Sequence, residues 1–232
     1  MIHIFAEEIQ RIELEIAQLD SNSKENHQES KRIFATTSCQ SNSVVLLHLL
    51  QRFRPKTQVF FLNTGYLFPE TLAFRDQLSD FFGLNITTLR SQRSPLQQLN
   101  TSGRQLYTSD PDFCCHINKV EPLEPILMTH DIWINGVRGT QSSIRSQMQR
   151  FQPTKHNVLR YHPLLQWDSR MIYYYIQEHN LPKHPLEDKG YKSIGCQPCT
   201  RSFFDDLDNR EGRWQGMNKT ECGLHTTLGI SK

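Results

Sequence analysis

The sequence lacks any hydrophobic run long enough to cross a membrane. Its strongest apolar stretch, residues 44–50, is short and is interrupted by His48, whereas a membrane-spanning helix needs about 20 apolar residues. The first eight residues also lack the cationic start and the sustained apolar segment of a signal peptide. These absences predict a cytoplasmic protein without a membrane partner.

A strong net charge is also missing. The 26 Lys and Arg residues nearly balance the 24 Asp and Glu residues, which leaves a formal net charge of +2 at pH 7. A charge this small gives no reason to expect nucleic acid or a membrane surface as a partner. Attraction for an anionic ligand would have to come from local groups of Arg, Lys and His. The length of 232 residues suits one domain with a sizeable core.

Strand-like and helix-like segments alternate along most of the chain. This alternation predicts an α/β fold, in which an open, mostly parallel twisted sheet carries helices on both faces. Ligands of such sheets bind in the loops at the carboxyl ends of the strands. The predicted strands span 32–36, 57–62, 84–89 and 132–136, and the predicted helices span 44–51, 69–82 and 169–179.

The N-terminal segment predicts an additional, amphipathic helix. Phe5, Ile9, Ile12, Ile16 and Leu19 recur every three or four residues. Such a stripe packs either on the core of its own domain or on a second subunit, so a homo-oligomer is compatible with it. Polar residues after the stripe predict a linker.

Two of the predicted strand–helix loops carry side chains that suit an anion. Ser38 and Ser43 lie in a hydroxyl-rich loop before a helix, where backbone N–H groups bind anions, although an ordinary polar loop explains them equally well. This loop contains no glycine, so it is neither a Walker A loop nor G-x-G-x-x-G. A later loop contains Arg138 and Arg145, whose guanidinium groups match phosphate and sulfate oxygens. The alternative is that both arginines are solvated at the surface.

The six cysteines are grouped, and in a reducing cytoplasm such groups indicate metal ligands or catalytic thiols. The adjacent pair Cys114 and Cys115, together with Cys196-x-x-Cys199, supplies four thiolates. This is the ligand set of an iron–sulfur cluster or of structural zinc. Adjacent thiolates favour a [4Fe–4S] cubane, because each then binds a different iron. The alternatives are a zinc-binding module without catalysis and a dithiol redox pair.

Five motifs together resemble the phosphoadenylyl-sulfate and adenylyl-sulfate reductase family. The resemblance covers most of the chain and is most specific towards its C-terminus. The first motif has Asn63 where Asp is common in the family. The motifs are similar to D-T-G-x-L-F-P-E-T at 63–71, G-x-R-x-x-Q-S-x-x-R at 136–145, G-Y-x-S-I-G-C-x-P-C-T at 190–200, R-x-G-R-W at 210–214 and K-x-E-C-G-L-H at 219–225.

The resemblance implies an adenine nucleotide alpha-hydrolase-like fold and a thiol mechanism. Cys222 would displace AMP from adenylyl sulfate and become an S-sulfocysteine, from which thioredoxin or a glutaredoxin-like reductant releases sulfite. This reaction belongs to sulfate assimilation and cysteine biosynthesis. Cys114, Cys115, Cys196 and Cys199 would hold the [4Fe–4S] cluster of the cluster-bearing branch. The implied substrate-binding residues are Ser38, Ser43, Asn63, Thr64, Gly65, Leu67, Lys119, Gly136, Arg138, Gln141, Arg145, Arg210, Arg213 and His225.

The residues around Cys222 agree with a nucleophilic role. Lys219 and His225 flank it in sequence and two arginines shortly precede it, and cationic surroundings depress the pKa of a thiol. Cys39 is expected to be a small loop residue beside the nucleotide. The sequence therefore predicts that the chain has three parts. These are an N-terminal helix and linker at 1–31, a nucleotide-binding α/β domain at 32–188, and a C-terminal segment with cluster ligands and catalytic tail at 189–232.

Two related activities are the alternatives within this resemblance. One is reduction of the 3′-phosphorylated substrate, although family members that act on it commonly lack the four paired cysteines. The other is ATP pyrophosphatase chemistry, which in relatives depends on S-G-G-x-D-S in the first loop. Residues 36–43 read T-T-S-C-Q-S-N-S, so this second alternative is disfavoured.

Overall fold

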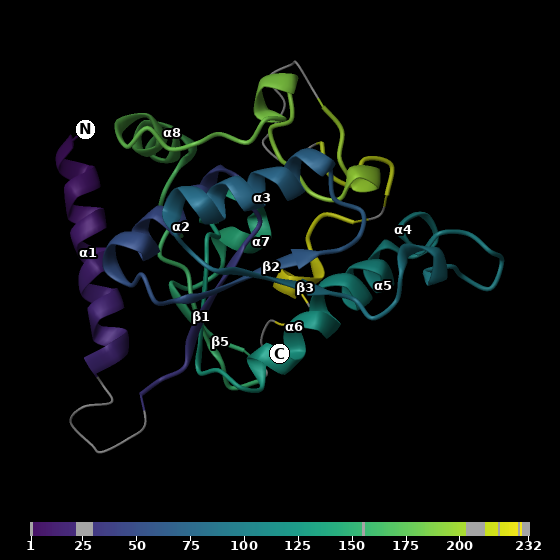
Figure 1. Ribbon diagram of the computed structural model, residues 1–232, viewed down its shortest axis with the longest axis horizontal. Helices are drawn as coiled ribbons and strands as arrows, with labels where there is room; N and C mark the ends of the chain where they lie inside the picture. The colour runs from purple at the N-terminus through teal and green to yellow at the C-terminus, as the bar shows by residue number, and fades with distance from the viewer. Residues whose placement is uncertain are drawn as a thin grey trace.

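One six-stranded sheet forms the centre of the molecule (Figure 1), in the order β3-β2-β1-β4-β6-β5. Neighbouring strands are parallel except β5, which runs antiparallel to β6. The predicted α/β fold with a mostly parallel sheet is therefore confirmed. The computed structural model describes residues 2–21, 30–154, 156–202, 212–217, 219–226 and 228. The strands are β1 (Ile33–Thr37), β2 (Gln58–Asn63), β3 (Ile86–Arg90), β4 (Ile132–Asn135), β5 (Phe151–Pro153) and β6 (Leu159–Tyr161).

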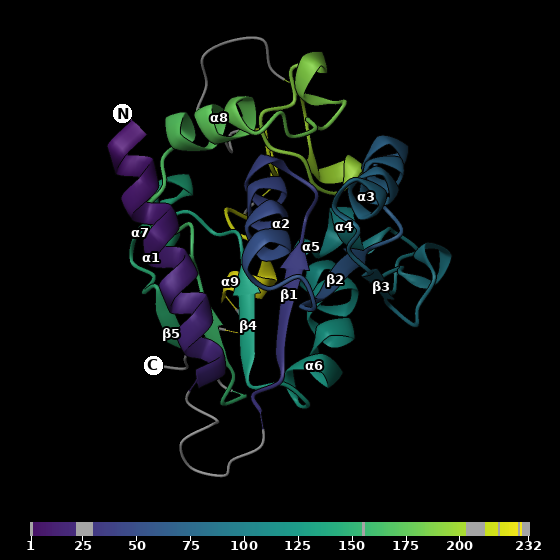
Figure 2. The same cartoon turned by 60° about the vertical axis from the view of Figure 1, so that its left-hand side comes forward.

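Helices cover both faces of this sheet. Figure 2 shows α1 and α2 on the near side of β1 and β4. Among the described helices, none is long and apolar enough to span a membrane. The helices are α1 (Ile2–Ser21), α2 (Ser41–Phe53), α3 (Pro69–Phe82), α4 (Leu106–Ser109), α5 (Pro111–Cys115), α6 (Glu121–Leu127), α7 (Ser143–Ser146), α8 (Ser169–Glu178) and α9 (Gly223–Thr226), with short turns η1 (Pro95–Gln97), η3 (Gly139–Gln141), η4 (Glu187–Lys189) and η5 (Gln197–Cys199).

The central strands are apolar on both sides, and alternate residues enter two separate cores. Ile33 and Ala35 of β1 face the larger core, which contains residues of α1, α2, α3 and α8. Phe34, between them, faces the smaller core with Trp133 and residues of α6. The period of two along a strand explains this division. A strand with both faces buried reads as a continuous apolar run, which is why the sequence predicted β1, β2 and β4.

The N-terminal stripe packs on the chain's own core. Ile12, Ile16 and Leu19 are buried in the larger cluster, and Phe5 and Ile9 are partly buried against it. The stripe is therefore used within the domain, and a homo-oligomer stays a prediction. The division of the chain into three parts also stays a prediction.

A partly buried ion pair fastens α1 to the sheet edge. Both carboxylate oxygens of Glu15 accept from Arg150 Nε at 2.8 Å, and Tyr161 Oη donates to Glu15 at 2.6 Å. Glu15→Gln is expected to lower the free energy of unfolding by about 1.5–3 kcal/mol, because hydrogen bonds to a charged group are lost. Urea denaturation measures this difference. An unchanged unfolding midpoint would contradict the anchoring role.

The structure contains a helical stretch that we did not predict, at 111–127. It consists of α5, a π-helical turn η2 (His116–Val120) and α6. Pro122 and Pro125 cannot donate backbone hydrogen bonds, so the sequence pattern does not read as one helix. The antiparallel edge formed by β5 and β6 was also missed, because strands of three residues show too few repeats of the alternating pattern.

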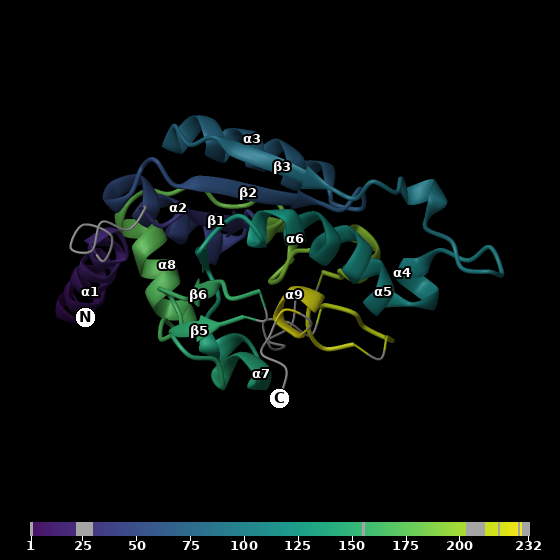
Figure 3. The ribbon, with the colours of Figure 1, turned by 90° about the horizontal axis from the view of Figure 1, so that it is seen from below.

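The predicted ligand-binding loops meet at the carboxyl edge of the sheet. Loop 37–43 follows β1, loop 63–68 follows β2, and loop 136–145 follows β4. Figure 3 shows the C-terminal helix α9 beside the stretch that contains α5 and α6, and α9 contacts η2 directly. Helix α9 thus lies in the same region as the three loops.

Candidate active site

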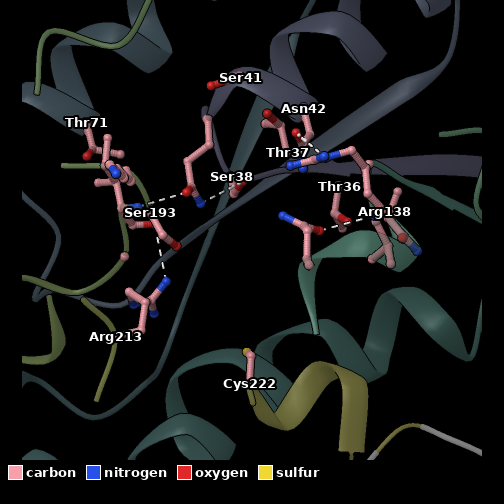
Figure 4. A pocket seen from close by; sticks show the side chains of 18 of the residues that line it. Thr36, Thr37, Ser38, Ser41, Asn42, Thr71, Arg138, Ser193, Arg213 and Cys222 are labelled. Carbon is pink, nitrogen blue, oxygen red and sulfur yellow. Dashed lines mark hydrogen bonds between the residues drawn. The ribbon is translucent and has the colours of Figure 1, made fainter. Parts of the chain in front are cut away.

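A cavity of about 460 Å³ opens at the carboxyl edge of the sheet (Figure 4). Residues of the loops at 37–43, 63–68 and 136–145 line it, together with residues 192–196 and, further along the chain, Arg213, Trp214, Cys222 and Leu224. In Figure 4 the sulfur of Cys222 points into the space between Arg213 and Arg138. The structure brings together, as cavity-lining residues, the predicted Ser38, Thr64, Leu67, Lys119, Gly136, Arg138, Gln141, Arg145, Arg213, Cys196 and Cys222.

The cavity wall is cationic. Among the described residues, six Lys or Arg side chains and two carboxylates line it. One of the carboxylates, Glu187, accepts a hydrogen bond from Ser41 Oγ at 2.7 Å, and burial raises its pKa. Since the net charge of the whole chain is only +2, the positive charge is concentrated here. Such a surface favours an anionic ligand.

The first loop folds around two serine side chains. Ser43 Oγ accepts from the backbone N–H of Ser38 at 3.1 Å and lies 3.0 Å from Ser38 Oγ. Ser38 lines the cavity, but Ser43 is buried behind it. Cys39 adopts a left-handed φ of 56° and its side chain enters the hydrophobic core. The expectation that Cys39 lies beside the nucleotide therefore does not match its position, since it lines neither cavity described here.

The second loop is held in a tight turn by its own side chains. Asn63 Oδ1 accepts from the backbone N–H of Gly65 at 3.0 Å, as in an Asx-turn. Gly65 has φ of +77°, and a Cβ there would lie 2.7 Å from Pro95, so glycine is required. Neither Asn63 nor Gly65 lines the cavity. Their effect is to present Thr64 and Leu67, which do.

The third loop positions Arg138 inside the site. Arg138 Nε donates to Asn42 Oδ1 at 2.9 Å, and its Nη1 donates to Ser169 Oγ at 3.2 Å. Gln141 Oε1 accepts from the Arg138 backbone N–H at 3.1 Å. Burial is the main cause that lowers the pKa of Arg138 to about 10, so the side chain remains cationic at neutral pH.

Arg145, in α7, is paired with the residue that precedes Cys222. Its Nε donates to Glu221 Oε2 at 2.7 Å and its Nη2 to Glu221 Oε1 at 3.1 Å. Both side chains are buried, with exposed fractions of 8% and 1%. The predicted anion ligand Arg145 thus lies in the site, but its charge is balanced there by a carboxylate.

Cys222 lies against a lysine and a second thiol. Lys119 Nζ, at the end of η2, is 3.7 Å from Cys222 Sγ. A hydrogen bond with the Cys115 thiol lowers the pKa of Cys222 well below its usual value, and Lys119 adds to this effect despite burial. Burial alone would lower the pKa of Lys119, but the neighbouring thiols Cys222, Cys115 and Cys196 raise it. The thiolate–ammonium pair is therefore favoured.

The direction of the pKa shift of Cys222 agrees with the sequence, and one of the two preceding arginines, Arg213, contributes to it, but the larger contributions come from Cys115 and Lys119. Lys219, expected to act on the thiol, forms an ion pair with Asp112 of α5. Arg210 and the side chain of His225 lie outside the described residues. The resemblance placed Lys119 among the substrate-binding residues, but the sequence alone did not show that it contacts Cys222, more than a hundred residues later.

A second, narrower cavity adjoins the first and is lined by all four paired cysteines. Cys114, Cys115 and Cys199 are buried, Cys196 is partly exposed, and all four thiols are free. Lys119 lines both cavities. Among the described residues, no three Cys, His, Asp or Glu side chains converge closely enough to ligate one metal ion. A cubane needs a wider spacing, because each thiolate binds a separate iron.

Polar donors reach two of these sulfur atoms. Thr64 Oγ1 is 3.2 Å from Cys196 Sγ, and Asn118 Nδ2 is 3.6 Å from Cys114 Sγ. Asn118 is itself fixed by a reciprocal pair of amide hydrogen bonds with the buried Gln98, at 3.0 and 2.7 Å. Donors to sulfur stabilise the thiolate form that metal ligation requires. The residues around the second cavity therefore fit a thiolate-bound cluster.

The Arg213 guanidinium occupies the space that a side chain at residue 195 would fill. A Cβ at Gly195 would overlap the Arg213 guanidinium, which also donates to the Ile194 carbonyl at 3.4 Å. The next residue, Trp214, is buried and lines both cavities. The motif at 210–214 contains Trp214, but the sequence did not indicate that this residue lines the site.

Gly195→Ala is expected to weaken binding of the anionic substrate about 10- to 100-fold, because displacing Arg213 removes a charged hydrogen-bond donor. Isothermal titration with AMP measures the change. The Gly195→Ala/Arg213→Ala double variant should bind no more weakly than Arg213→Ala alone. Additive losses in the double variant would show that glycine is needed for a different reason.

The fold and the cavity define a class of α/β proteins that bind an anion at the carboxyl edge of a parallel sheet. The comparisons agree. A crystal structure of a phosphoadenylyl-sulfate reductase from Candida auris, a phosphate complex, superposes with a TM-score of 0.64 at 19% identity, covering 84% of this chain and 96% of that one. This likeness concerns the fold.

Sequence similarity identifies the family. The phosphoadenosine phosphosulfate reductase domain matches residues 32–202. A phosphoadenosine 5′-phosphosulfate reductase of Gloeobacter violaceus is 42% identical over 79% of this chain and 78% of its own length. An adenosine 5′-phosphosulfate reductase of Salinibacter ruber is 38% identical over 80% of this chain and 75% of its own. The chain belongs to the phosphoadenosine phosphosulfate reductase family.

Proposed function

We propose that this protein reduces adenylyl sulfate to sulfite and AMP, with Cys222 as the nucleophile. The observation that carries the proposal is the position of Cys222: its thiol lies 3.7 Å from Lys119 in the cavity lined by the three loops at the carboxyl edge of the sheet. A thiol beside cationic groups is an activated nucleophile. The family and the relatives named above support sulfate reduction as its chemistry.

In the first step, the Cys222 thiolate attacks the sulfur of adenylyl sulfate. An S–S bond forms, the bond between that sulfur and the bridging phosphate oxygen breaks, and AMP leaves with the electron pair. Lys119, Arg138 and Arg213 are placed to neutralise the phosphosulfate and the phosphate that departs. Arg210 and His225 remain candidates for the same role.

In the second step, a dithiol protein such as thioredoxin or a glutaredoxin-like reductant attacks Cys222 Sγ. Sulfite leaves, a mixed disulfide forms, and the second thiol of the reductant resolves it. The two electrons that reduce the sulfur thus come from the dithiol, which becomes a disulfide. The electrons of the two steps therefore balance without any other electron donor.

We also propose that Cys114, Cys115, Cys196 and Cys199 hold a [4Fe–4S] cluster. When bound, the cluster would supply structural support and a local charge beside the substrate. The four cysteines fit this role because they line one cavity next to Lys119. Thr64 and Asn118 would donate to their sulfur atoms and orient them.

The same assay tests the reaction and its substrate. The anaerobically purified protein is incubated with thioredoxin and either adenylyl sulfate or its 3′-phosphorylated form, and sulfite is measured. We expect sulfite from adenylyl sulfate, since the four paired cysteines mark the branch that uses it. The 42% identical relative named for the 3′-phosphorylated substrate makes that compound the second candidate. No sulfite from either compound would overturn the proposed function.

A further inference from the structure

We propose that the ion pair between Arg145 and Glu221 docks the segment formed by residues 219–226 and so sets the position of Cys222 for attack. Glu221 directly precedes Cys222, so a shift of its backbone moves the thiol. The inference rests on the proposed function, because it assigns Glu221 a positioning role in the transfer step.

The contact is bidentate and shielded from water. Two nitrogen atoms of Arg145 donate to the two carboxylate oxygens of Glu221, and the third donates to Gln141 Oε1. Ser142 Oγ adds a weaker bond to Glu221 at 3.4 Å. Parallel charge-assisted bonds fix direction as well as distance. Since all three nitrogen atoms of Arg145 donate to protein groups, we assign Arg145 to the docking of the segment.

A second arginine holds the segment on the other side of the nucleophile. Arg160 of β6 donates from Nη1 to the carbonyl oxygen of Leu224 at 3.2 Å. The Arg160 guanidinium lies 4.3 Å from the centre of the Trp133 ring, and the whole side chain is buried. Cys222 therefore lies between two residues, 221 and 224, that arginines of the folded body hold in place.

The energetics suit a contact that forms and breaks. If Arg145 were removed, the Glu221 carboxylate would stay buried without its bidentate cationic partner, which is strongly unfavourable. If the segment undocks instead, both charges regain water, and the net loss is small because desolvation offsets much of the attraction of a buried pair. The pair thus selects one docked position without preventing release. Release is what a protein-sized reductant needs to reach Cys222.

The two half-reactions separate this role from a general loss of structure. Glu221→Gln keeps the shape of the side chain but removes the charge that Arg145 binds. We expect single-turnover formation of S-sulfo-Cys222, followed by mass spectrometry, to slow about 100-fold, because misplacement of a reacting atom by about 1 Å costs this much. AMP affinity should not fall, because the variant removes a negative charge next to the site. Once loaded to completion, the variant should release sulfite to thioredoxin at least as fast as wild type.

A matched pair elsewhere supplies the control. Glu15→Gln breaks the partly buried ion pair between this α1 residue and Arg150 and should lower stability without changing either half-reaction. If Glu221→Gln fails to fold, Arg145→Lys tests the same contact, since it keeps the charge but loses the bidentate fork. It should slow the transfer step alone.

Two outcomes would contradict the positioning role of the ion pair, and a third would contradict the proposed function. Wild-type transfer in a folded variant at position 221 or 145 would exclude the positioning role. An equal fall in both half-reactions would also exclude it, since that indicates general damage. If wild type itself forms no S-sulfo-Cys222, the proposed function fails instead.

Discussion

Cys222→Ser is expected to stop sulfite production from adenylyl sulfate, with a loss of at least about 1,000-fold, as for removal of other nucleophiles. The serine hydroxyl stays protonated beside Lys119, whereas the thiol has a lowered pKa. The nucleotide site is otherwise intact, so AMP should bind with unchanged affinity. The colorimetric sulfite assay and titration with AMP measure the two effects separately.

Cys39→Ser is the control for this prediction. Cys39 is also a free cysteine, but burial raises the pKa of its thiol to about 12 and it lines neither cavity. Its replacement should leave sulfite production in place. Full activity of Cys222→Ser, or formation of an S-sulfocysteine at another cysteine, would be incompatible with the proposed mechanism.

The second large effect is expected at the paired cysteines. Replacing Cys199 or Cys114 by alanine should abolish the broad visible absorption of an iron–sulfur cluster, together with bound iron and acid-labile sulfide, since a cluster loses a thiolate ligand. Melting temperature should fall as well, because metal binding is coupled to folding. Absorption spectroscopy and iron analysis of anaerobically purified protein provide readouts that do not depend on activity.

Two outcomes would count against the cluster. A colourless wild-type protein that contains zinc would replace it with a structural zinc site, while the thiol mechanism at Cys222 would stand. Each of the four paired cysteines can be replaced by alanine in turn. If all four variants retained the full iron content, these cysteines would not be the ligands. Cys39→Ser again serves as the control and should retain its iron.

Much of the fold was predictable because its signals are local or regular. The apolar runs around Phe34, Phe60 and Trp133 mark strands buried on both faces, and the observed helix after residue 168 begins with Asp168 accepting from Met171 N, as a capping residue should. α2 begins three residues earlier than predicted, at Ser41. Polar residues are common both at the start of a helix and in loops, so the sequence did not show where this helix begins.

The candidate site was less predictable, because its geometry depends on contacts across the whole chain. The spacing of the cysteines indicated their grouping, but nothing in the sequence shows that Glu221 meets Arg145 or that Lys119 meets Cys222. Asn63 and Gly65 were expected to bind substrate, whereas their observed contacts shape the loop that presents Thr64. A sequence motif does not distinguish the residues that contact a ligand from the residues that hold them in position.

The π-helical turn at His116–Val120 has a consequence for how this segment can change by insertion or deletion. It places two cysteines before the turn and Lys119 within it, and successive residues of an α-helix are rotated by about 100°. Deleting one residue between Cys115 and Lys119 would convert a wide turn into a narrower one and swing the ammonium group away from Cys222. A change of length here should therefore disturb the site even when every side chain is kept, so the number of residues in this turn is itself part of the site.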